Sequence, residues 1–515
     1  VEERTAAAVD EGEAGVSRLS RAGLWLGPLL AVVVWWLLPA SYIDGAGEAV
    51  ALGGTARATA AIATWMAVWW MTEAVHIAVT SLLPIGMLPL LGGFAIKDVT
   101  APYGHELVYL FLGGFMLALA MQRWGLHMRI ALLVLRYVGS QPRTIIGAFM
   151  ATTAFLSAWV SNTATTTMMM PVALSAIAVV VGVGARGARD GEVSEARARS
   201  EKNFATALML GIAYASTIGG MATILGTAPN LFLVSYARDQ LGVEVTFLGW
   251  LAFGVPIAAT YLPATWWVLT RRLFPIDLPP VEGSREQAVA QWKALGPMSR
   301  GEWTTLVVFV LTALAWLTRP YLVAWTVGGV APLAGLTDSG IAVLAALALF
   351  VLPSGRGPVL DWKTGTKLPW GVLLLFGGGF SLAASIESSG LGAWIGQALA
   401  GFGALPPLAL VVMVTTAISL LSELASNAAT TATLVPVLAN VATAIGIAPM
   451  ALIVPVTFAA SCAFALPVGT PPNAIVYGTG HVAMRDMVKA GLVLDVIGVG
   501  IIAAVTWFIV LPLYG

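Results

Sequence analysis

The stretch SNTATTTMMMP, Ser161–Pro171, sets one amide and a run of hydroxyls inside a long apolar part of the chain. A related stretch, SNAATTATLVP, occupies Ser426–Pro436, 265 positions further along. Polar groups at membrane depth cost free energy unless something binds them. The sequence therefore raises the question of what these two matching clusters bind.

The composition indicates a polytopic membrane protein. Of the 515 residues, 58% are hydrophobic and 10% are charged, whereas soluble proteins have about 25% charged residues. Apolar runs of about 20 residues recur along the chain, as membrane-spanning helices require. The net charge of zero gives no basis for a nucleic-acid partner. A single cysteine, Cys462, excludes an internal disulfide framework and a cysteine-based metal site.

The apolar runs predict an all-α protein with eleven crossings and two re-entrant hairpins. The crossings are expected at 22–40, 57–73, 76–92, 107–122, 203–237, 246–270, 302–318, 339–353, 370–386, 449–480 and 488–513. The stretches 143–183 and 405–447 each have polar residues at the middle, which favours hairpins that enter and leave on one side. The first apolar run is interpreted as a retained span and not as a signal peptide.

The basic residues predict the orientation. With the N-terminus in the cytoplasm and the C-terminus outside, 22 of the 26 Lys and Arg fall on the cytoplasmic side, as the positive-inside rule predicts. The four on the outer side are Arg57, Lys97, Arg238 and Arg319. The segment 123–142 is typical of an amphipathic helix at the membrane surface. The segment 273–300 is expected to be a connector with a surface helix.

The chain repeats itself in an inverted sense. The offset of 265 also pairs Gly113 with Gly378 and Gly125 with Gly390, and an offset of 243 pairs GTAPN, Gly226–Asn230, with GTPPN, Gly469–Asn473. The equivalent fourth and ninth crossings are five apart in order, and an odd shift inverts the second half. Inverted repeats with broken helices are the signature of secondary transporters, and Gly and Pro predict breaks at both GT-x-PN runs.

The two hairpin tips and the two breaks are predicted to form one site. Its expected lining is Ser157, Ser161, Asn162, Thr163, Gly226, Thr227, Ser422, Ser426, Asn427, Gly469, Thr470 and Pro471. Side-chain oxygens and freed carbonyls suit a hard cation such as Na⁺, and amide and hydroxyl donors suit an anion. The lining has no Lys or Arg, so bound cations would supply the positive charge. Hydroxyls and amides in membrane helices often serve only helix packing, but four motifs in two inverted pairs favour a binding site.

Glu423 is the one carboxylate inside a predicted hairpin, and two interpretations remain open. It either bonds the local backbone or binds a proton or cation. A membrane-embedded enzyme is a remote alternative, because the sequence offers no metal cluster, no paired carboxylate and no activated nucleophile.

At these motifs the chain resembles the divalent anion/sodium symporter (DASS) family of dicarboxylate, citrate and sulfate carriers. The resemblance lies in WWMTEAVHIAVTSLLP (69–84), both Ser-Asn tips, ASTIGGMATILGTAPN (215–230) and ALPVGTPPNAIVYG (465–478), and it covers the chain from residue 22 onward. Two departures stand out. Ala428 lacks the hydroxyl that Thr163 offers, and His76 stands where such sequences usually have Pro.

The resemblance implies an elevator-type homodimer in the cell's plasma membrane, with lipid around it. A cytoplasmic tail (1–21) precedes a first scaffold segment (22–142) and a first transport-domain segment (143–272). A connector with the second scaffold segment (273–404) leads to the second transport-domain segment (405–515). The resemblance also implies the cation and substrate sites. One Na⁺ site would lie near Ser157, Ser161, Asn162 and Gly226, and another near Ser422, Ser426, Asn427 and Gly469. The substrate would meet Asn162, Thr163, Thr227, Asn427, Ala428, Thr470 and Pro471.

The resemblance implies Na⁺-coupled uptake of C4-dicarboxylates such as succinate, malate or fumarate, with two or more Na⁺ per cycle. One alternative is a Na⁺-independent exchanger of the same fold that carries dicarboxylate, citrate or sulfate. Another is a related ion antiporter that uses Glu423.

Overall fold

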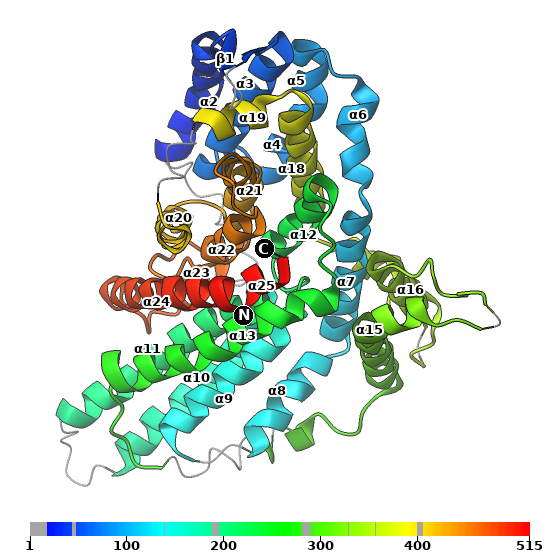
Figure 1. Ribbon diagram of the computed structural model, residues 1–515. Coiled ribbons are helices and arrows are strands. Elements are labelled where there is room, and N and C mark those ends of the chain that lie inside the picture. Colours follow the sequence, from blue (N-terminus) through cyan, green and yellow to red (C-terminus); the bar gives the residue numbers. More distant parts are fainter. Residues whose placement is uncertain are drawn as a thin grey trace.

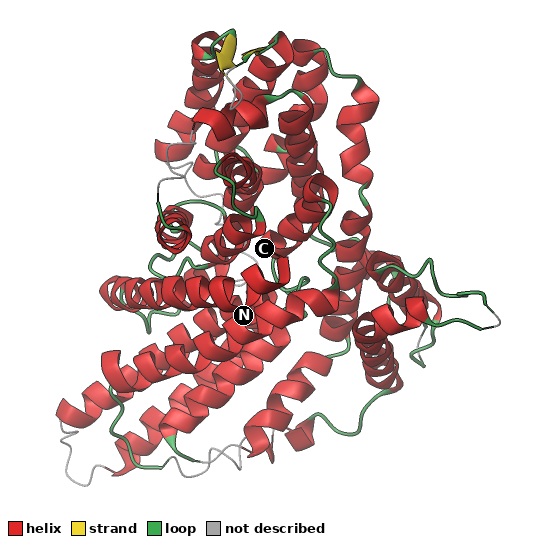
Figure 2. Cartoon of the chain, in the orientation of Figure 1, coloured by secondary structure: helices red, strands yellow, loops and turns green. Residues whose placement is uncertain are grey.

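The computed structural model describes residues 18–43, 48–137, 140–187, 195–280, 289–290, 292–327, 329–355, 357–398 and 405–514. In these ranges the chain is almost wholly α-helical (Figure 2). One two-stranded antiparallel ladder, β1 (Ser41–Ile43) with β2 (Ala49–Ala51), joins the first two helices. The predicted all-α class is confirmed. Most of the predicted tail and some of the 273–300 connector lie outside the described residues.

The N-terminal helices follow the predicted spans closely. They are α2 (Arg18–Leu37), α3 (Gly54–Thr72), α4 (Ile77–Thr80), α5 (Leu83–Gly92), α6 (Ile96–Thr100), a 3₁₀ turn (Ala101–Gly104), α7 (Glu106–Arg123) and α8 (Leu126–Tyr137). The crossing expected at 76–92 corresponds to two helices, α4 and α5, because a turn at Ser81 and Leu82 divides the apolar run. Pro84 lacks the amide hydrogen that would continue the helix from Thr80. His76 caps α4, since its Nδ1 accepts the Ala78 N–H at 3.3 Å.

The middle of the chain forms the first hairpin, the first broken helix and the helices after them. These elements are α9 (Pro142–Ser157), α10 (Asn162–Gly187), α11 (Glu195–Met221), α12 (Ala228–Leu241), α13 (Phe247–Trp267) with a π-helical end (Val268–Leu273), α15 (Arg300–Ala324), α16 (Asp338–Val351) and α17 (Trp362–Gly365). A buried ion pair, Arg129 Nε to Glu302 Oε1 at 2.7 Å, fastens α8 to α15.

The last portion of the chain repeats the order of the elements from α7 to α12. It contains α18 (Trp370–Ser388), α19 (Leu391–Ala398), α20 (Pro407–Ser422), α21 (Asn427–Ala444), α22 (Met450–Ser461) and α23 (Pro471–Tyr477). The chain ends with α24 (Met484–Val505), a π-helical turn (Thr506–Val510) and α25 (Leu511–Tyr514). Both predicted hairpins are therefore helix–turn–helix pairs, and both predicted breaks interrupt helices.

Paired glycines show the repeat in the backbone. Gly125 between α7 and α8 has φ +68°, and Gly390 between α18 and α19 has φ +75°, a region that favours glycine. A Cβ on Gly113 would lie 2.5 Å from the Ala342 carbonyl carbon, and one on Gly378 would lie 2.4 Å from the Ser81 oxygen. Both glycines thus allow α7 and α18 to cross a neighbouring backbone closely.

Within the described residues, seven helical segments are long and apolar enough to span a membrane. They are Ser20–Leu37, Ile96–Arg123, Glu195–Met221, Phe247–Leu273, Arg300–Ala324, Trp370–Ser388 and Met484–Tyr514. Four shorter apolar stretches, Ile77–Gly92, Asp338–Val351, Pro407–Ser422 and Met450–Ser461, complete the set. The number of crossings and the re-entrance of the hairpins remain predictions.

Both broken helices lie at the centre of the molecule. The apolar window of α11 is fully buried, and so is every residue of α22. Helix α10 of the first hairpin packs on α23, and α21 of the second hairpin packs on α12. The orange and red C-terminal helices accordingly lie against the green α11–α13 in Figure 1. Non-helical backbone at membrane depth needs this protein covering, and the exchange of partners brings all four polar motifs into one region.

Candidate functional site

Each hairpin tip carries the same hydrogen bond. Ser157 ends α9 and donates from Oγ to Oδ1 of Asn162, the first residue of α10, over 2.7 Å. Ser422 ends α20 and donates to Oδ1 of Asn427 over 2.9 Å. The structure thus brings together the Ser and Asn that were predicted as cation ligands in each half. A serine hydroxyl that donates its proton in a hydrogen bond still has free lone pairs on oxygen, which suit a cation.

Each break is held by the asparagine that ends its GT-x-PN motif. Asn230 donates from Nδ2 to the carbonyls of Gly220 (3.0 Å) and Thr223 (2.8 Å). In the second half, Asn473 donates in the same way to Ala463 (2.9 Å) and Leu466 (3.0 Å). Both asparagines are fully buried. They replace helical hydrogen bonds lost at the breaks. Both motifs were predicted to break helices, but no role was predicted for these two asparagines.

The first tip and the first break meet at Gly220. A Cβ on Gly220 would lie 2.6 Å from Asn162 Oδ1, 2.7 Å from Thr227 Cγ2 and 3.1 Å from the Gly226 oxygen. Two oxygens predicted to bind the first Na⁺, those of Asn162 and Gly226, therefore border the same small volume. Gly220 was not predicted, although a side chain there would fill that volume.

The two halves tie tip to break from opposite sides. In the first half, a residue of the break reaches the tip, because the Thr223 hydroxyl donates to the Ala158 carbonyl and accepts the Gly226 N–H. In the second half, a residue of the tip reaches the break. Oε1 of Glu423 accepts the Ala465 N–H at 2.7 Å, and Oε2 accepts the Leu466 N–H at 2.9 Å.

Position 423 is equivalent to position 158. In the second half the Glu423 carboxylate therefore links tip to break, as the Thr223 hydroxyl does in the first half. Of the two interpretations left open for Glu423, the structure shows a bond to backbone, but to the backbone of the second break, 42 positions away, and not to the local chain. A Cβ on Gly469 would lie 3.2 Å from Glu423 Oε2, which places the carboxylate beside the predicted second cation site. The Ser422 hydroxyl also reaches the Ala460 carbonyl, a further bond between this tip and α22.

The substrate-facing residues differ between the halves. Thr227 and Thr470 have nearly the same backbone, with φ −140° and ψ 150° against φ −145° and ψ 149°. The Thr470 hydroxyl accepts the Asn473 N–H, whereas the buried Thr227 Oγ1 has no hydrogen-bond partner in the described part of the protein. A buried hydroxyl without a partner is available to a ligand.

The remaining predicted residues lie at or near the two tips and the second break. Ser161, Thr163 and Pro471 are exposed, and Ser426, Asn427 and Ala428 are half-buried. Ser161 Oγ accepts the Ala164 N–H at 3.4 Å. The two tips and the two breaks contain hydroxyls, amides and carbonyls and no basic residue.

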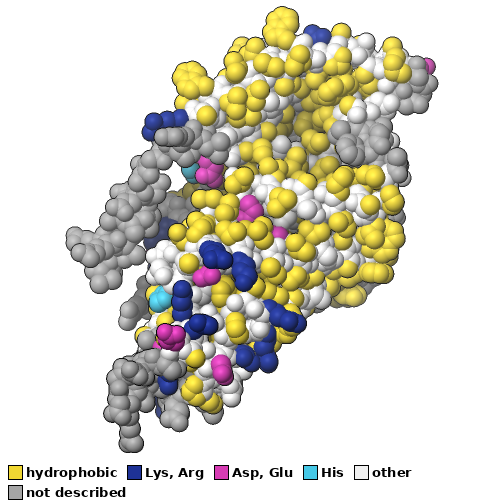
Figure 3. Space-filling view, turned by 90° about the vertical axis from the view of Figure 1, so that its left-hand side faces the viewer, with side chains coloured by type: hydrophobic (Ala, Val, Ile, Leu, Met, Phe, Trp, Pro, Cys, Tyr) yellow, Lys and Arg dark blue, Asp and Glu magenta, His cyan; other side chains and the backbone are white. Residues whose placement is uncertain are grey.

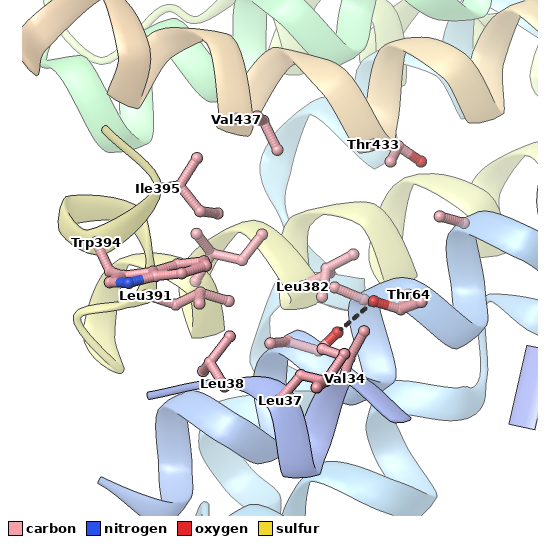
Figure 4. A pocket seen from close by; sticks show the side chains of 14 residues that line it. Val34, Leu37, Leu38, Thr64, Leu382, Leu391, Trp394, Ile395, Thr433 and Val437 are labelled. Carbon is pink, nitrogen blue, oxygen red and sulfur yellow. Dashed lines mark hydrogen bonds between the residues drawn. The ribbon is translucent and has the colours of Figure 1, made fainter. Parts of the chain in front are cut away.

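A pocket of about 430 Å³ lies elsewhere, between α2, α3, α18, α19 and α21 (Figure 4). Its lining is almost wholly apolar, with Leu37, Trp394 and Ile395 among the side chains in view. The Thr64 hydroxyl bonds the Ala60 carbonyl of its own helix. This pocket offers no set of ligands for an ion and does not compete with the polar site.

Comparison with known proteins settles the family. The family described as the sodium:sulfate symporter transmembrane region matches residues 24–514. The chain belongs to the sodium:sulfate symporter family. This family assignment confirms the resemblance drawn from the paired motifs, and it covers both halves of the repeat.

Relatives within this family are carriers. The chain is 37% identical over 498 residues to the sodium-dependent dicarboxylate transporter SdcS of Staphylococcus saprophyticus, with 96% of this chain and 92% of the relative covered. It is 36% identical over 492 residues to SdcS of Staphylococcus aureus strain USA300, with 95% and 90% covered.

Among solved structures, the YdaH transporter of Alcanivorax borkumensis superposes with a TM-score of 0.57 at 15% identity. The match covers 96% of this chain and 98% of YdaH. At this identity the likeness supports the membrane-transporter fold alone.

Proposed function

We propose that this chain is a Na⁺-coupled carrier that takes up C4-dicarboxylates such as succinate, malate or fumarate. The observation that carries the proposal is the duplicated Ser-to-Asn hydrogen bond at the two tips. Each bond sets oxygens for a cation beside a freed end of a broken helix. The name of the staphylococcal relatives, sodium-dependent dicarboxylate transporter, supports the choice of ion and substrate.

The proposed Na⁺ sites use the oxygens of each tip with its break. Ser157, Ser161, Asn162 and Gly226 would hold one ion, and Ser422, Ser426, Asn427 and Gly469 would hold the other. The substrate carboxylates would lie between them, against Asn162, Thr163, Thr227, Asn427, Ala428, Thr470 and Pro471. Because no basic side chain is present in the tips or breaks, the bound Na⁺ would supply the charge that stabilises an anion at this depth.

The decisive experiment is uptake by proteoliposomes that contain the purified full-length chain. Labelled succinate should accumulate with an inward Na⁺ gradient and should not accumulate when choline replaces Na⁺. Asn162→Ala and Asn427→Ala should each abolish uptake. Asn440→Ala is the matched control, since Asn440 lies on α21 and bonds the Pro436 carbonyl of its own helix.

Two results would overturn the proposal. One is near-normal uptake by either tip variant at normal expression. The other is uptake that depends on internal dicarboxylate and ignores Na⁺, which would identify the exchanger instead. Competition by citrate and sulfate in the same assay would separate the candidate anions.

We also propose an elevator mechanism in a homodimer embedded in the lipid of the plasma membrane. The transport domain would comprise residues 143–272 and 405–515, and the scaffold residues 22–142 and 273–404. The packing of α10 on α23 and of α21 on α12 supports one moving body, because each hairpin contacts the broken helices of both halves.

The proposed boundary between the bodies is crossed by ion pairs at the surface. His105 meets Asp239 at 2.9 Å, Arg238 contacts Glu106, and Arg319 meets Glu244 at 2.8 Å. Two of these pairs include a side chain that is mostly buried, His105 or Arg319. Pairs near the protein surface contribute only about 0–1 kcal/mol each, so they are compatible with sliding. A disulfide between Glu106→Cys and Arg238→Cys should stop transport, and reduction should restore it. Undiminished transport by the crosslinked protein would exclude relative motion at this boundary.

The proposed orientation places the N-terminus in the cytoplasm and the C-terminus outside. In Figure 3, most of the basic side chains in view gather toward one end of the molecule, and hydrophobic side chains cover much of the rest. This asymmetry supports the orientation drawn from the positive-inside pattern. Labelling of cysteines placed near each terminus by a membrane-impermeant reagent tests it.

A further inference from the structure

The apolar pocket of Figure 4 lies between the two proposed bodies of the protein. The helices α2, α3, α18 and α19 on its walls belong to the proposed scaffold, and α21 belongs to the second hairpin of the proposed transport domain. Thr433 and Val437 of α21 lie on one side, opposite Val34, Leu37 and Leu38 of α2. Although α21 packs on α3, α18 and α19, the contact between the bodies therefore contains a cavity of about 430 Å³.

The side chains of this pocket are suited to an apolar occupant. Among the described residues that line it, none is charged, and both threonine hydroxyls are already engaged. Thr64 donates to the Ala60 carbonyl at 2.8 Å, and Thr433 donates to the Ala429 carbonyl at 2.8 Å. An ordered water needs roughly two to four polar partners, so the pocket favours an apolar group over water or an ion.

The pocket opens onto the part of the surface that faces lipid. Leu37 lines the pocket and is 75% exposed, and Val33 and Trp36 beside it are exposed as well. Only 17% of the apolar window of α2 is buried, so this span presents most of its surface to hydrocarbon. The lining is therefore continuous with the lipid-facing surface of α2, and a lipid tail can enter without crossing a polar region.

The volume of the pocket fits one lipid tail better than a helix of another protein. A helix with its side chains is about 10–12 Å wide, so two turns of it, about 11 Å long, exceed the volume available. Cavities of about 300–1,000 Å³ are typical of sites that enclose small ligands. An unfilled apolar cavity is also unfavourable, because the atoms of its lining lose packing contacts. We propose that the pocket binds one acyl chain of a membrane phospholipid, wedged between α21 and the scaffold helices.

The bound acyl chain would favour the conformation that has this pocket. Movement of the proposed transport domain would carry Thr433 and Val437 past α3 and α18 and would change the shape of the pocket. A ligand that fits one conformation better shifts the population toward that conformation, so the acyl chain would slow the transport cycle. This consequence rests on the proposed function, whereas binding of the acyl chain does not.

A phospholipid that carries a photoreactive diazirine on one acyl chain tests the binding directly. The full-length protein is placed in nanodiscs with this lipid and irradiated, and peptide mass spectrometry locates the label. We expect label on Leu382 and Ile386, which line the pocket and are only 2% and 3% exposed. Val32 on the exposed face of α2 should also be labelled, but it reports the surrounding lipid and not the pocket.

Variants that fill the pocket should displace the acyl chain. Ala63→Trp adds bulk from α3 and should remove most of the label from Leu382 and Ile386. Val437→Phe adds bulk from the α21 side and should have the same effect, so the test survives if one variant fails to fold. Val32→Trp is the matched control, since Val32 is exposed on α2 and lies outside the lining, and it should leave the label in the pocket unchanged.

The wild type alone can overturn the inference. Label on the exposed face of α2 without label on Leu382 or Ile386 would exclude an acyl chain in the pocket. The same result is expected if a second copy of the chain covers the pocket, and it would overturn the proposal equally. Undiminished label in both filled variants would place the lipid outside the pocket.

The transport consequence is tested with labelled succinate in proteoliposomes. Ala63→Trp replaces an acyl chain that can leave with a side chain that cannot, so Na⁺-driven uptake should be slower than in the wild type. Val32→Trp should match the wild type. Equal rates for Ala63→Trp and the wild type would contradict the effect on the cycle and leave the binding result standing. Absence of any uptake by the wild type would contradict the proposed carrier function, and the labelling would still decide whether the acyl chain binds.

Discussion

Asn230 donates two hydrogen bonds across the first break, and Asn473 donates two across the second break to the equivalent carbonyls. This relationship explains how non-helical backbone persists in the centre of the molecule. Each asparagine also leaves its Oδ1 buried without a hydrogen-bond partner among the described residues. The amide nitrogen is therefore the half of the side chain that holds the break.

Asn230→Asp and Asn473→Asp should each destabilise the protein, because the change keeps the shape and removes the donor. Two buried carbonyls then lose their partner, at about 1–3 kcal/mol for each unsatisfied group. The melting temperature of the purified protein should fall for both variants. Asn203→Asp is the control, since its amide bonds the Pro275 carbonyl in an exposed place. An equal fall for the control would show that the breaks have no special need of this donor.

Ser157→Ala and Ser422→Ala should each weaken Na⁺ binding, because the Asn oxygen at that tip loses its holding bond. A typical hydrogen bond contributes about 0.5–1.5 kcal/mol, so the apparent Na⁺ affinity should fall by roughly two- to tenfold. Na⁺ dependence of succinate uptake measures the effect. Ser385→Ala should leave it unchanged, since that hydroxyl bonds only the Ser381 carbonyl of its own helix. A normal Na⁺ dependence in both tip variants would remove these serines from the cation sites.

Ala428→Thr should tighten binding of a short dicarboxylate or shift the preference among anions, without a change in Na⁺ dependence. Thr163 is exposed at the first tip, and Ala428 is half-buried at the equivalent place. A new hydroxyl that meets a charged oxygen contributes roughly 1.5–3 kcal/mol, about ten- to a hundredfold in affinity. If the space left beside the small Ala428 side chain accommodates a bulkier anion such as citrate, Thr at position 428 should hinder binding of that anion.

The matched variant for this prediction is Thr163→Ala, which should weaken dicarboxylate binding. Apparent affinities for succinate, malate, citrate and sulfate measure both changes. Unchanged values for Ala428→Thr across all four anions would show that residue 428 faces away from the substrate.

Uptake should respond to the membrane potential if more than two Na⁺ accompany each dianion. Every net charge that crosses is then worth about 2.3 kcal/mol per 100 mV. Valinomycin with varied K⁺ sets the potential across the proteoliposome membrane, and labelled succinate reports the rate. An inside-negative potential should speed uptake. A rate that ignores the potential would indicate electroneutral coupling, as expected for two Na⁺ with one dianion or for exchange of equal charges.

The sequence by itself determined the helical class, the internal repeat and the four polar motifs. In hydrocarbon every backbone N–H and C=O must be hydrogen-bonded within the protein, so apolar runs about 20 residues long predict helices with little ambiguity. Gly and Pro mark the breaks because they act on the backbone of their own residue. The Ser-Asn contact at each tip was predictable because it is local in the sequence. Five positions separate Ser157 from Asn162, and a tight turn keeps them in contact.

Only the tertiary structure decided which distant groups meet. Gly220 borders the first site because the tip of a hairpin packs against a broken helix, and α24 packs against α20 of the second hairpin. Neither contact leaves a local pattern in the sequence. The same holds for the opposite directions of the Thr223 and Glu423 links. A side chain 65 or 42 positions from its partner is placed by the packing of helices, and not by the propensities of its neighbours.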